Sequence, residues 1–231
     1  MQKIQTSTPS YPLSTVPGYH ASKPGIQLGT QVPADIGEED ISLIKQLGVE
    51  WVMTSLPPSD DGPVTGPEAY ASIRRRFEDH GLSVYRIGNH RCHNMSSVTL
   101  NLEDRDEKVN EYLQYIRDLG EAGIRYATYA HMANGIWSSA REEIRGGAVA
   151  RALRLDGEPE GHWSKQLWKG ELSHGREYSE EELWDNYGYF IERVVPVAEE
   201  AGVRIGIHPD DPPVYPLGGI PRCLFGNFDG Y

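Results

Sequence analysis

The chain has 231 residues, of which 38% are hydrophobic and 24% are charged, and its formal net charge at pH 7 is −12. This length and hydrophobic content are enough for one large domain with a buried core. The acidic balance argues against a broad nucleic-acid-binding surface or an anionic membrane surface, although a few local arginines can still attract an anionic substrate.

The apolar runs and the cysteines indicate the compartment. The longest apolar runs are far shorter than the ~20 residues that span a bilayer. The N-terminus shows no basic region followed by an apolar stretch, so we expect no signal peptide. Cys92 and Cys223 are too few for a disulfide framework, which fits a reducing compartment. We therefore expect a cytoplasmic protein with no nucleic-acid or membrane partner, and a homo-oligomer is compatible with these features.

The first half of the chain predicts an irregular arm followed by alternating strands and helices. Residues 1–24 hold several prolines among Ser and Thr and predict the arm. Apolar periodicity and the glycines that end each helix predict the elements that follow. The predicted strands are 26–28, 49–54 and 82–87, and the predicted helices are 36–47 and 68–80, with a Pro- and Gly-rich loop at 57–67.

The second half continues the alternation around one long interruption. A helix over 104–122 and a strand over 124–130 precede residues 131–179, which lack strong periodicity and predict a long insertion or lid. Ser179 and Glu182 form a capping box that starts a helix running to about Ala201. Pro196 lies inside this helix and predicts a kink or a break, and the last strand is predicted at 203–207.

Three junctions share the order helix, glycine, short strand, and they indicate repeated β-α units. They are Leu47-Gly-Val-Glu-Trp51, Ala122-Gly-Ile-Arg-Tyr126 and Ala201-Gly-Val-Arg-Ile205. Such units build either a closed eight-stranded barrel or an open doubly wound sheet. No Gly-rich phosphate loop follows the first strand, which disfavours the dinucleotide-binding version. We therefore predict an α/β fold of the TIM-barrel type over residues 25–231, with about five of the eight β-α units.

The carboxyl ends of barrel strands carry the active site, so the residues at those ends are the candidates. His208 follows an apolar strand and precedes Pro209-Asp-Asp-Pro-Pro213. A neutral imidazole at a strand end can bind a divalent metal, and the prolines would fix the loop. Asp210 and Asp211 could orient the ring, ligate, bind substrate or cap the following turn.

Two further strand ends carry histidines. His131 ends the fourth strand, where an acid–base role and a purely structural one are both open. His90, Arg91 and His93 share a polar loop after the third strand, which fits either the binding of carboxylate and hydroxyl groups or a solvated surface loop.

The long segment after the fourth strand adds four candidates for substrate binding: Trp137, Arg141, His174 and Arg176. Arg can hold a carboxylate through two parallel hydrogen bonds, although a surface ion pair is the alternative for any single Arg. His174 and Arg176 could belong to a lid, and Trp163 and Trp168 could supply apolar cover.

The segment from Val194 to Pro213, followed by Leu217-Gly-Gly-Ile-Pro-Arg222, strongly resembles mannonate dehydratases. The Gly-Val-Glu-Trp-Val, Gly-Leu-Ser-Val and Gly-Ile-Arg-Tyr strands match in the same order, so the resemblance extends from about residue 25 to the end. It implies a TIM barrel related to the xylose isomerase-like sugar isomerases. It also implies removal of water from D-mannonate to give 2-keto-3-deoxygluconate, in glucuronate breakdown, with Mn²⁺ or Fe²⁺. His208 would be one metal ligand.

The sequence departs from that family in two places. The family's other ligands, a Cys, a His and an Asp, come from the last three strands, and they have no counterpart before Tyr231; Cys223 does not follow a strand. We therefore expect a C-terminal truncation. At the fourth strand, Ala130-His131-Met132 replaces the Asn- or Asp-Phe-Met-Pro of the family, which indicates a divergent subfamily.

These residues suggest a mechanism with its alternatives. A sugar-acid substrate would bind the metal and lose a proton and then a hydroxyl, with His131, His93 and Asp211 as the candidate catalytic groups. A sugar isomerase or epimerase on the same barrel is the first alternative. The second is an incomplete, non-catalytic chain or one that needs a partner subunit.

Overall fold

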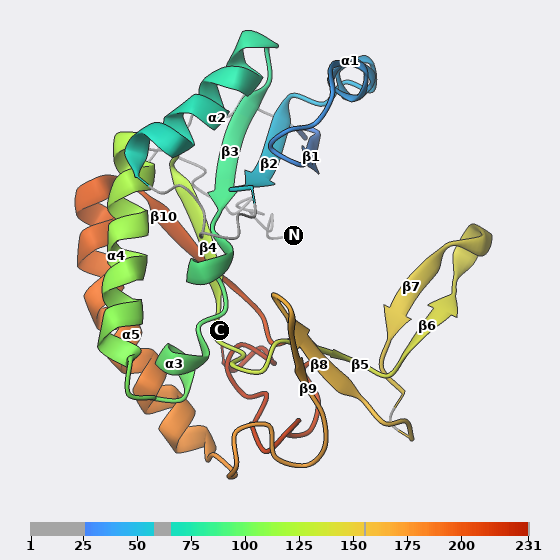
Figure 1. Ribbon diagram of the computed structural model, residues 1–231, viewed down its shortest axis with the longest axis vertical. Coiled ribbons are helices and arrows are strands. Elements are labelled where there is room, and N and C mark those ends of the chain that lie inside the picture. Colours follow the sequence, from blue (N-terminus) through green and yellow to red (C-terminus); the bar gives the residue numbers. More distant parts are fainter. Residues whose placement is uncertain (1–25, 58–65, 155, 231) are drawn as a thin grey trace, which may run out of the picture.

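The computed structural model describes residues 26–57, 66–154 and 156–230 (Figure 1). The arm predicted at residues 1–24 and most of the loop predicted at 57–67 lie outside these residues. In the described part, strands and helices alternate as the sequence predicted, except in the segment between the fourth parallel strand and the last helix.

Five parallel strands follow one another in chain order. The first three, β1 (Gly29–Gln31), β2 (Trp51–Ser55) and β3 (Ser83–Gly88), form one sheet. The last two, β4 (Tyr126–Ala130) and β10 (Arg204–His208), pair in register along their whole length. A parallel bridge between Asn94 and Ala130 lies between the two groups, where β3 and β4 approach each other. This strand order is that of a β/α-barrel wall and confirms the predicted fold class.

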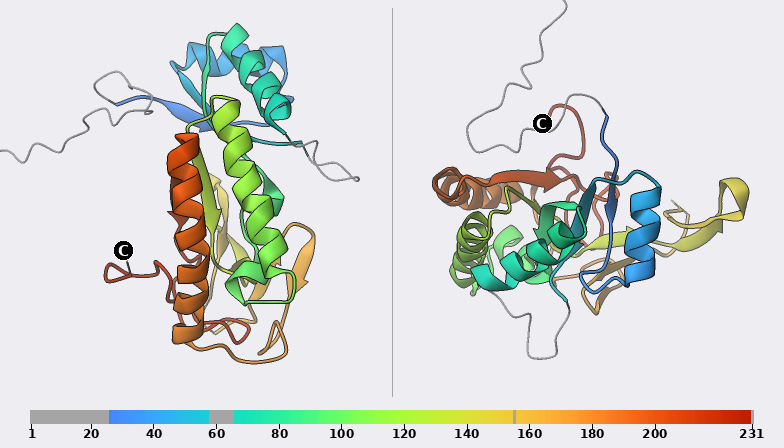
Figure 2. Two further views of the ribbon diagram at one scale, coloured as in Figure 1. Left: turned by 90° about the vertical axis from the view of Figure 1, so that its left-hand side faces the viewer. Right: turned by 90° about the horizontal axis from the view of Figure 1, so that it is seen from above.

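The helices cover one side of this wall (Figure 2). They are α1 (Glu38–Gln46), α2 (Pro67–Asp79), α4 (Arg105–Glu121) and α5 (Glu180–Ala201). Helix α5 begins with the predicted capping box, since Ser179 and Glu182 exchange both hydrogen bonds. It ends at Gly202, whose positive φ of 63° a residue with a side chain would adopt at a cost.

The main core lies between the parallel strands and the helices α2, α4 and α5. Its centre is aromatic: the ring centroid of Tyr112 on α4 lies 5.9 Å from that of Tyr129 on β4 and 5.1 Å from that of Phe190 on α5. All three side chains are buried. Edge-to-face contacts of this kind add to the stability that burial of the rings supplies.

Two predictions about local structure are wrong, and three short helices were not predicted. The first strand, β1, begins three residues later than the predicted 26–28. The backbone N–H groups of Glu50 and Trp51 both donate to the carbonyl oxygen of Leu28, and the regular pairing with β2 starts only at Gly29. The break predicted at Pro196 is absent, because α5 continues as one helix through that position. The short helices η1 (His90–Cys92), α3 (Ser96–Thr99) and η2 (Arg145–Gly147) were not predicted.

The segment 131–179 is not an irregular loop, because it holds five short antiparallel strands. One sheet has the order β5 (Ile136–Ser138), β8 (Glu160–Trp163), β9 (Gln166–Trp168). Strands β6 (Ala140–Glu143) and β7 (Val149–Ala152) form a hairpin that projects from the body of the molecule (Figure 1). Strands of three or four residues leave little periodicity to detect, and β5 and β8 pair across more than twenty residues. Among the helices of the described residues, none is long and apolar enough to cross a membrane.

Candidate active site at the carboxyl ends of the strands

The structure brings three predicted site histidines together, and we call His90, His93, His208 and Trp163 the histidine cluster. His93 follows β3 and η1, and His208 ends β10; their ring centroids lie 6.2 Å apart, edge to face. The indole of Trp163, on β8, stacks on His93 at 5.3 Å and lies 6.1 Å from His90. Trp163 thus takes the covering position predicted for it, and the cluster lies where β/α barrels hold their active sites.

His208 is exposed and its ring has one nitrogen available. Its Nδ1 lies 2.6 Å from the carbonyl oxygen of Pro209. A carbonyl oxygen only accepts, so Nδ1–H donates to it and the Nε2 lone pair is left free. This is the form of histidine that ligates a divalent metal. Within residues 26–57, 66–154 and 156–230, however, no group of three His, Cys, Asp or Glu side chains is placed to hold a metal ion. His208 could therefore supply one ligand to a divalent metal, and the other described residues do not complete a ligand set.

His93 is held in its neutral form. Its Nδ1 lies 3.2 Å from the carbonyl oxygen of Thr128 on β4. Burial lowers the pKa of His93 to about 4, despite this hydrogen bond, and the nearby positive charge of Arg86 lowers it further. At neutral pH the ring is an uncharged imidazole that can accept a proton.

Arg86 on β3 belongs to this region, although the sequence analysis did not select it. Its Nη1 donates to the thioether sulfur of Met53 at 2.9 Å. A Cβ placed on Gly88 would lie 2.8 Å from the Ser55 hydroxyl oxygen and 3.2 Å from Nη2 of Arg86, so these two groups converge above Gly88 at the ends of β2 and β3. A charged residue inside a predicted buried strand, Val84-Tyr-Arg-Ile87, was the signal that could have identified it.

His131 does not join the cluster. Its ring is buried against the helix layer, with centroids 5.5 Å from Tyr187 and 6.0 Å from Phe190, both on α5. Its Nε2 has no hydrogen-bond partner among the described residues, and burial lowers the pKa of His131 to about 3. The predicted acid–base role of His131 therefore has no geometric support, because the residue following β4 turns its side chain towards the helices.

The two aspartates after His208 have different surroundings. Asp210 is buried, and burial raises its pKa to about 7 although the charge of Arg222 and the backbone N–H of Leu224 oppose the shift. Asp211 is partly exposed, and its carboxylate lies 4.0 Å from the guanidinium of Arg151 on β7. Asp210 thus contributes to packing of the C-terminal segment, whereas Asp211 remains accessible beside the site.

Buried polar contacts hold that C-terminal segment against the end of β4. Arg222 donates to the Oδ1 of Asn134 at 2.8 Å and to the carbonyl oxygen of Gly135 at 3.1 Å. Asn134 in turn donates to the carbonyl oxygen of Leu217 at 2.8 Å. Burial lowers the pKa of Arg222 to about 10, partly offset by the two aspartates. The loop that follows His208 is therefore fixed to the body of the molecule.

The remaining predicted substrate-binding residues lie outside the histidine cluster. The exposed Arg91 pairs with Glu111 on α4, and Arg176 pairs with Glu182 while stacking on Tyr178. Arg141 is exposed on the projecting hairpin. The ring of His174 stacks on Trp168, and with Arg91 these two line a pocket of about 330 Å³.

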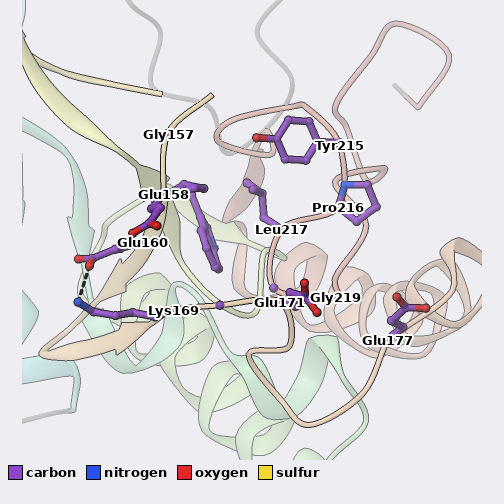
Figure 3. Close-up of a pocket in the computed structure, with 14 residues that line it drawn as sticks. Gly157, Glu158, Glu160, Lys169, Glu171, Glu177, Tyr215, Pro216, Leu217 and Gly219 are labelled. Carbon is purple, nitrogen blue, oxygen red and sulfur yellow. Dashed lines mark ion pairs between the residues drawn. The ribbon is translucent and has the colours of Figure 1, made fainter. Parts of the chain in front are cut away.

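Trp137 lines a larger cavity of about 850 Å³, which lies between the sheet of β5, β8 and β9 and residues 215–219 (Figure 3). Its charged lining residues are four glutamates and one lysine, Lys169, which pairs with Glu160. Carboxylates around a cavity repel an anionic ligand. The larger cavity is therefore unsuited to a sugar acid, and the histidine cluster remains the candidate site.

Parallel strands with histidines at their carboxyl ends and helices on the outer face define a β/α-barrel protein whose chemistry lies at the strand ends. The family model described as D-mannonate dehydratase (UxuA) matches residues 36–167 and 157–229. The chain belongs to the D-mannonate dehydratase family, as the resemblance of its C-terminal motif predicted.

Individual relatives agree with this assignment. Mannonate dehydratase 2 of Halalkalibacterium halodurans is 29% identical over 201 residues, which are 80% of this chain and 57% of the relative. The mannonate dehydratase of Streptococcus pneumoniae (strain 70585) is 30% identical over 197 residues, 78% of this chain and 53% of the relative. The chain thus spans about half the length of these curated relatives.

A solved structure confirms the fold. The crystal structure of mannonate dehydratase from Streptococcus suis serotype 2 superposes with a TM-score of 0.64 and 23% identity, covering 86% of this chain and 57% of that one. The partial barrel wall described above is therefore the architecture of a known mannonate dehydratase.

Proposed function

We propose that this chain supplies part of the active site of a metal-dependent hydro-lyase that removes water from D-mannonate to give 2-keto-3-deoxygluconate, in glucuronate breakdown. The observation that carries the proposal is the pairing of His208, exposed with a free Nε2, and His93, a neutral imidazole whose ring lies 6.2 Å away. One is suited to hold a metal and the other to move a proton.

The reaction needs only proton transfers and the loss of a hydroxyl. The C2–H bond next to the carboxylate breaks, the C3–O bond breaks, and one water leaves; the resulting enol becomes the 2-keto acid. A bound Mn²⁺ or Fe²⁺ would supply a Lewis acid for the carboxylate and a hydroxyl. His208 would hold that ion, in a set completed by residues other than those described.

His93 is the candidate base in this scheme. The Thr128 carbonyl fixes its Nδ1, and so its Nε2 is the nitrogen that can accept the proton. Trp163 stacks on its ring and limits the access of water to it. Asp211 is partly exposed and lies three residues after His208, the end of β10. It is the candidate group that assists the departing hydroxyl.

Metal analysis and a dehydration assay on the purified protein test the proposal. His208→Ala is expected to lower both bound Mn²⁺ and the formation of a 2-keto-3-deoxy acid, whereas His80→Ala, at the end of α2, leaves both unchanged. Unchanged metal content and turnover in His208→Ala would show that the ligand assignment is wrong. A product of the same mass as the substrate would instead show an isomerase or epimerase.

A further inference from the structure

Arg86 has contacts that are unusual for a partly buried cation. Its guanidinium donates to the thioether of Met53, which is a weak acceptor. Its Nε is buried without a hydrogen-bond partner among the described residues. Within that same part of the chain, no carboxylate forms an ion pair with it, whereas the arginines Arg74, Arg75, Arg91, Arg105, Arg151, Arg154 and Arg176 each have one.

An arginine withdrawn from water normally pairs with an anion, because unpaired burial of its donors costs stability. A planar guanidinium with free donors matches a carboxylate, to which it can donate two parallel hydrogen bonds. The unpaired state of Arg86 therefore indicates an anion that is not part of the described chain.

The absence of a side chain at Gly88 lets the Ser55 hydroxyl and the Arg86 guanidinium approach each other. A Cβ there would lie 2.8 Å from the Ser55 hydroxyl oxygen and 3.2 Å from Nη2 of Arg86. Ser55 and Gly88 are register partners at the ends of β2 and β3, so the two polar groups meet at the end of the barrel wall where the active site lies. The hydroxyl of Ser55 can donate a further hydrogen bond to the same anion.

The position also fits the histidine cluster. Arg86 and His93 lie only seven positions apart, Arg86 on β3 and His93 directly after η1. Asn89 and η1 carry the chain directly from the end of β3 to His93. An anion held by Arg86 and Ser55 would lie at the same end of the barrel wall as the candidate base.

We propose that Arg86, with the hydroxyl of Ser55, binds the carboxylate of the sugar acid at the ends of β2 and β3 and thereby selects an acid over the neutral sugar. This inference rests on the proposed function for the identity of the ligand. A carboxylate has two oxygens, so pairing with Arg86 is compatible with a metal at the other oxygen. The same contact favours an aldonate dehydratase over an isomerase of neutral sugars.

The test compares binding of D-mannonate and D-mannitol, which differ at carbon 1, by isothermal titration in the presence of a chelator so that turnover does not consume the ligand. We expect the wild-type protein to prefer mannonate and Arg86→Gln to bind mannonate about 10- to 100-fold more weakly. Arg86→Lys should retain part of the preference, since the charge remains while the planar fork is lost. Arg75→Gln, an exposed ion-paired arginine on α2, is the matched control and should bind like the wild type.

Gly88→Ala keeps the test decisive if Arg86→Gln does not fold. The added methyl would lie 2.8 Å from the Ser55 hydroxyl oxygen and 3.2 Å from Nη2 of Arg86. Both groups can rotate away, so this variant should fold, and it should weaken mannonate binding because the two binding groups are displaced. Equal binding of mannonate and mannitol by the wild type, no binding of mannonate, or unchanged mannonate affinity in folded Arg86→Gln or Gly88→Ala would each overturn the inference.

The dehydration assay separates the two proposals. Arg86-dependent mannonate binding without any dehydration by the complete enzyme contradicts the proposed function alone. Dehydration with an unchanged KM in Arg86→Gln contradicts this inference alone.

Discussion

Replacing His131 with Leu should make the protein more resistant to acid. His131 is 4% exposed, packs between Tyr187 and Phe190, and has a pKa of about 3. In the unfolded chain its pKa returns to the ordinary value of 6.5. Between these two values the unfolded state binds a proton that the folded state does not, so the folded state loses stability as the pH falls through 6.5.

The magnitude follows from the difference between the assay pH and the unfolded pKa. At pH 5 that difference is about 1.5 units, which corresponds to about 2 kcal/mol of lost stability. The value depends little on the folded pKa, provided that it lies well below 5. Leu is close to His in volume and removes no hydrogen bond recorded for His131, so we expect a change of less than about 1 kcal/mol at pH 8.

Urea unfolding of the wild type and His131→Leu at about pH 8 and about pH 5 measures this difference. The wild type should lose about 2 kcal/mol more than the variant between the two conditions. His80→Gln is the matched control, and its effect on acid stability should have the opposite sign. Hydrogen bonds to the Arg76 carbonyl and to Glu38 raise the pKa of His80, so the protonated His80 stabilises the folded state below pH 6.5. Equal losses in the wild type and His131→Leu would refute the burial of a neutral His131.

Four further substitutions test buried contacts, a helix cap and helix packing. Asn134→Ala removes the buried acceptor of Arg222 and should cost about 3–5 kcal/mol in urea unfolding and expose residues 211–230 to protease; retained protease resistance would contradict this role. Ser179→Ala removes the α5 cap and should cost about 1 kcal/mol by the same measurement, whereas no loss would mean that the cap contributes nothing. Gly120→Ala should destabilise by about 1–3 kcal/mol, because its Cβ would lie 2.6 Å from the last carbonyl oxygen of α5. Gly188→Ala, with open space around it, should instead stabilise by about 1 kcal/mol, and a thermal melt that ranks these two variants in the reverse order would refute the steric argument.

The order of strands and helices was predictable because it is a local property. Apolar periodicity sets each helix, and a glycine with a positive φ ends it, as Gly202 does after α5. The capping box at Ser179 acts within one turn of the chain and was therefore visible in the sequence. The segment 131–179 was not, because β5 pairs with β8 across more than twenty residues and neither strand is long enough to show an alternating pattern.

The sequence by itself determined the alternating β/α order, the family motif around His208 and the location of His93 and His208 after strands. Only the tertiary structure decided which of these side chains meet. His131 follows a strand as His208 ends one, yet it turns towards the helix layer, whereas Arg86, which the sequence analysis passed over, converges with Ser55 above Gly88. Successive side chains of a strand point to opposite faces, so a shift of one residue at its end exchanges the barrel side for the helix side. That choice is fixed by strand register and packing between distant segments, which composition and local spacing do not encode.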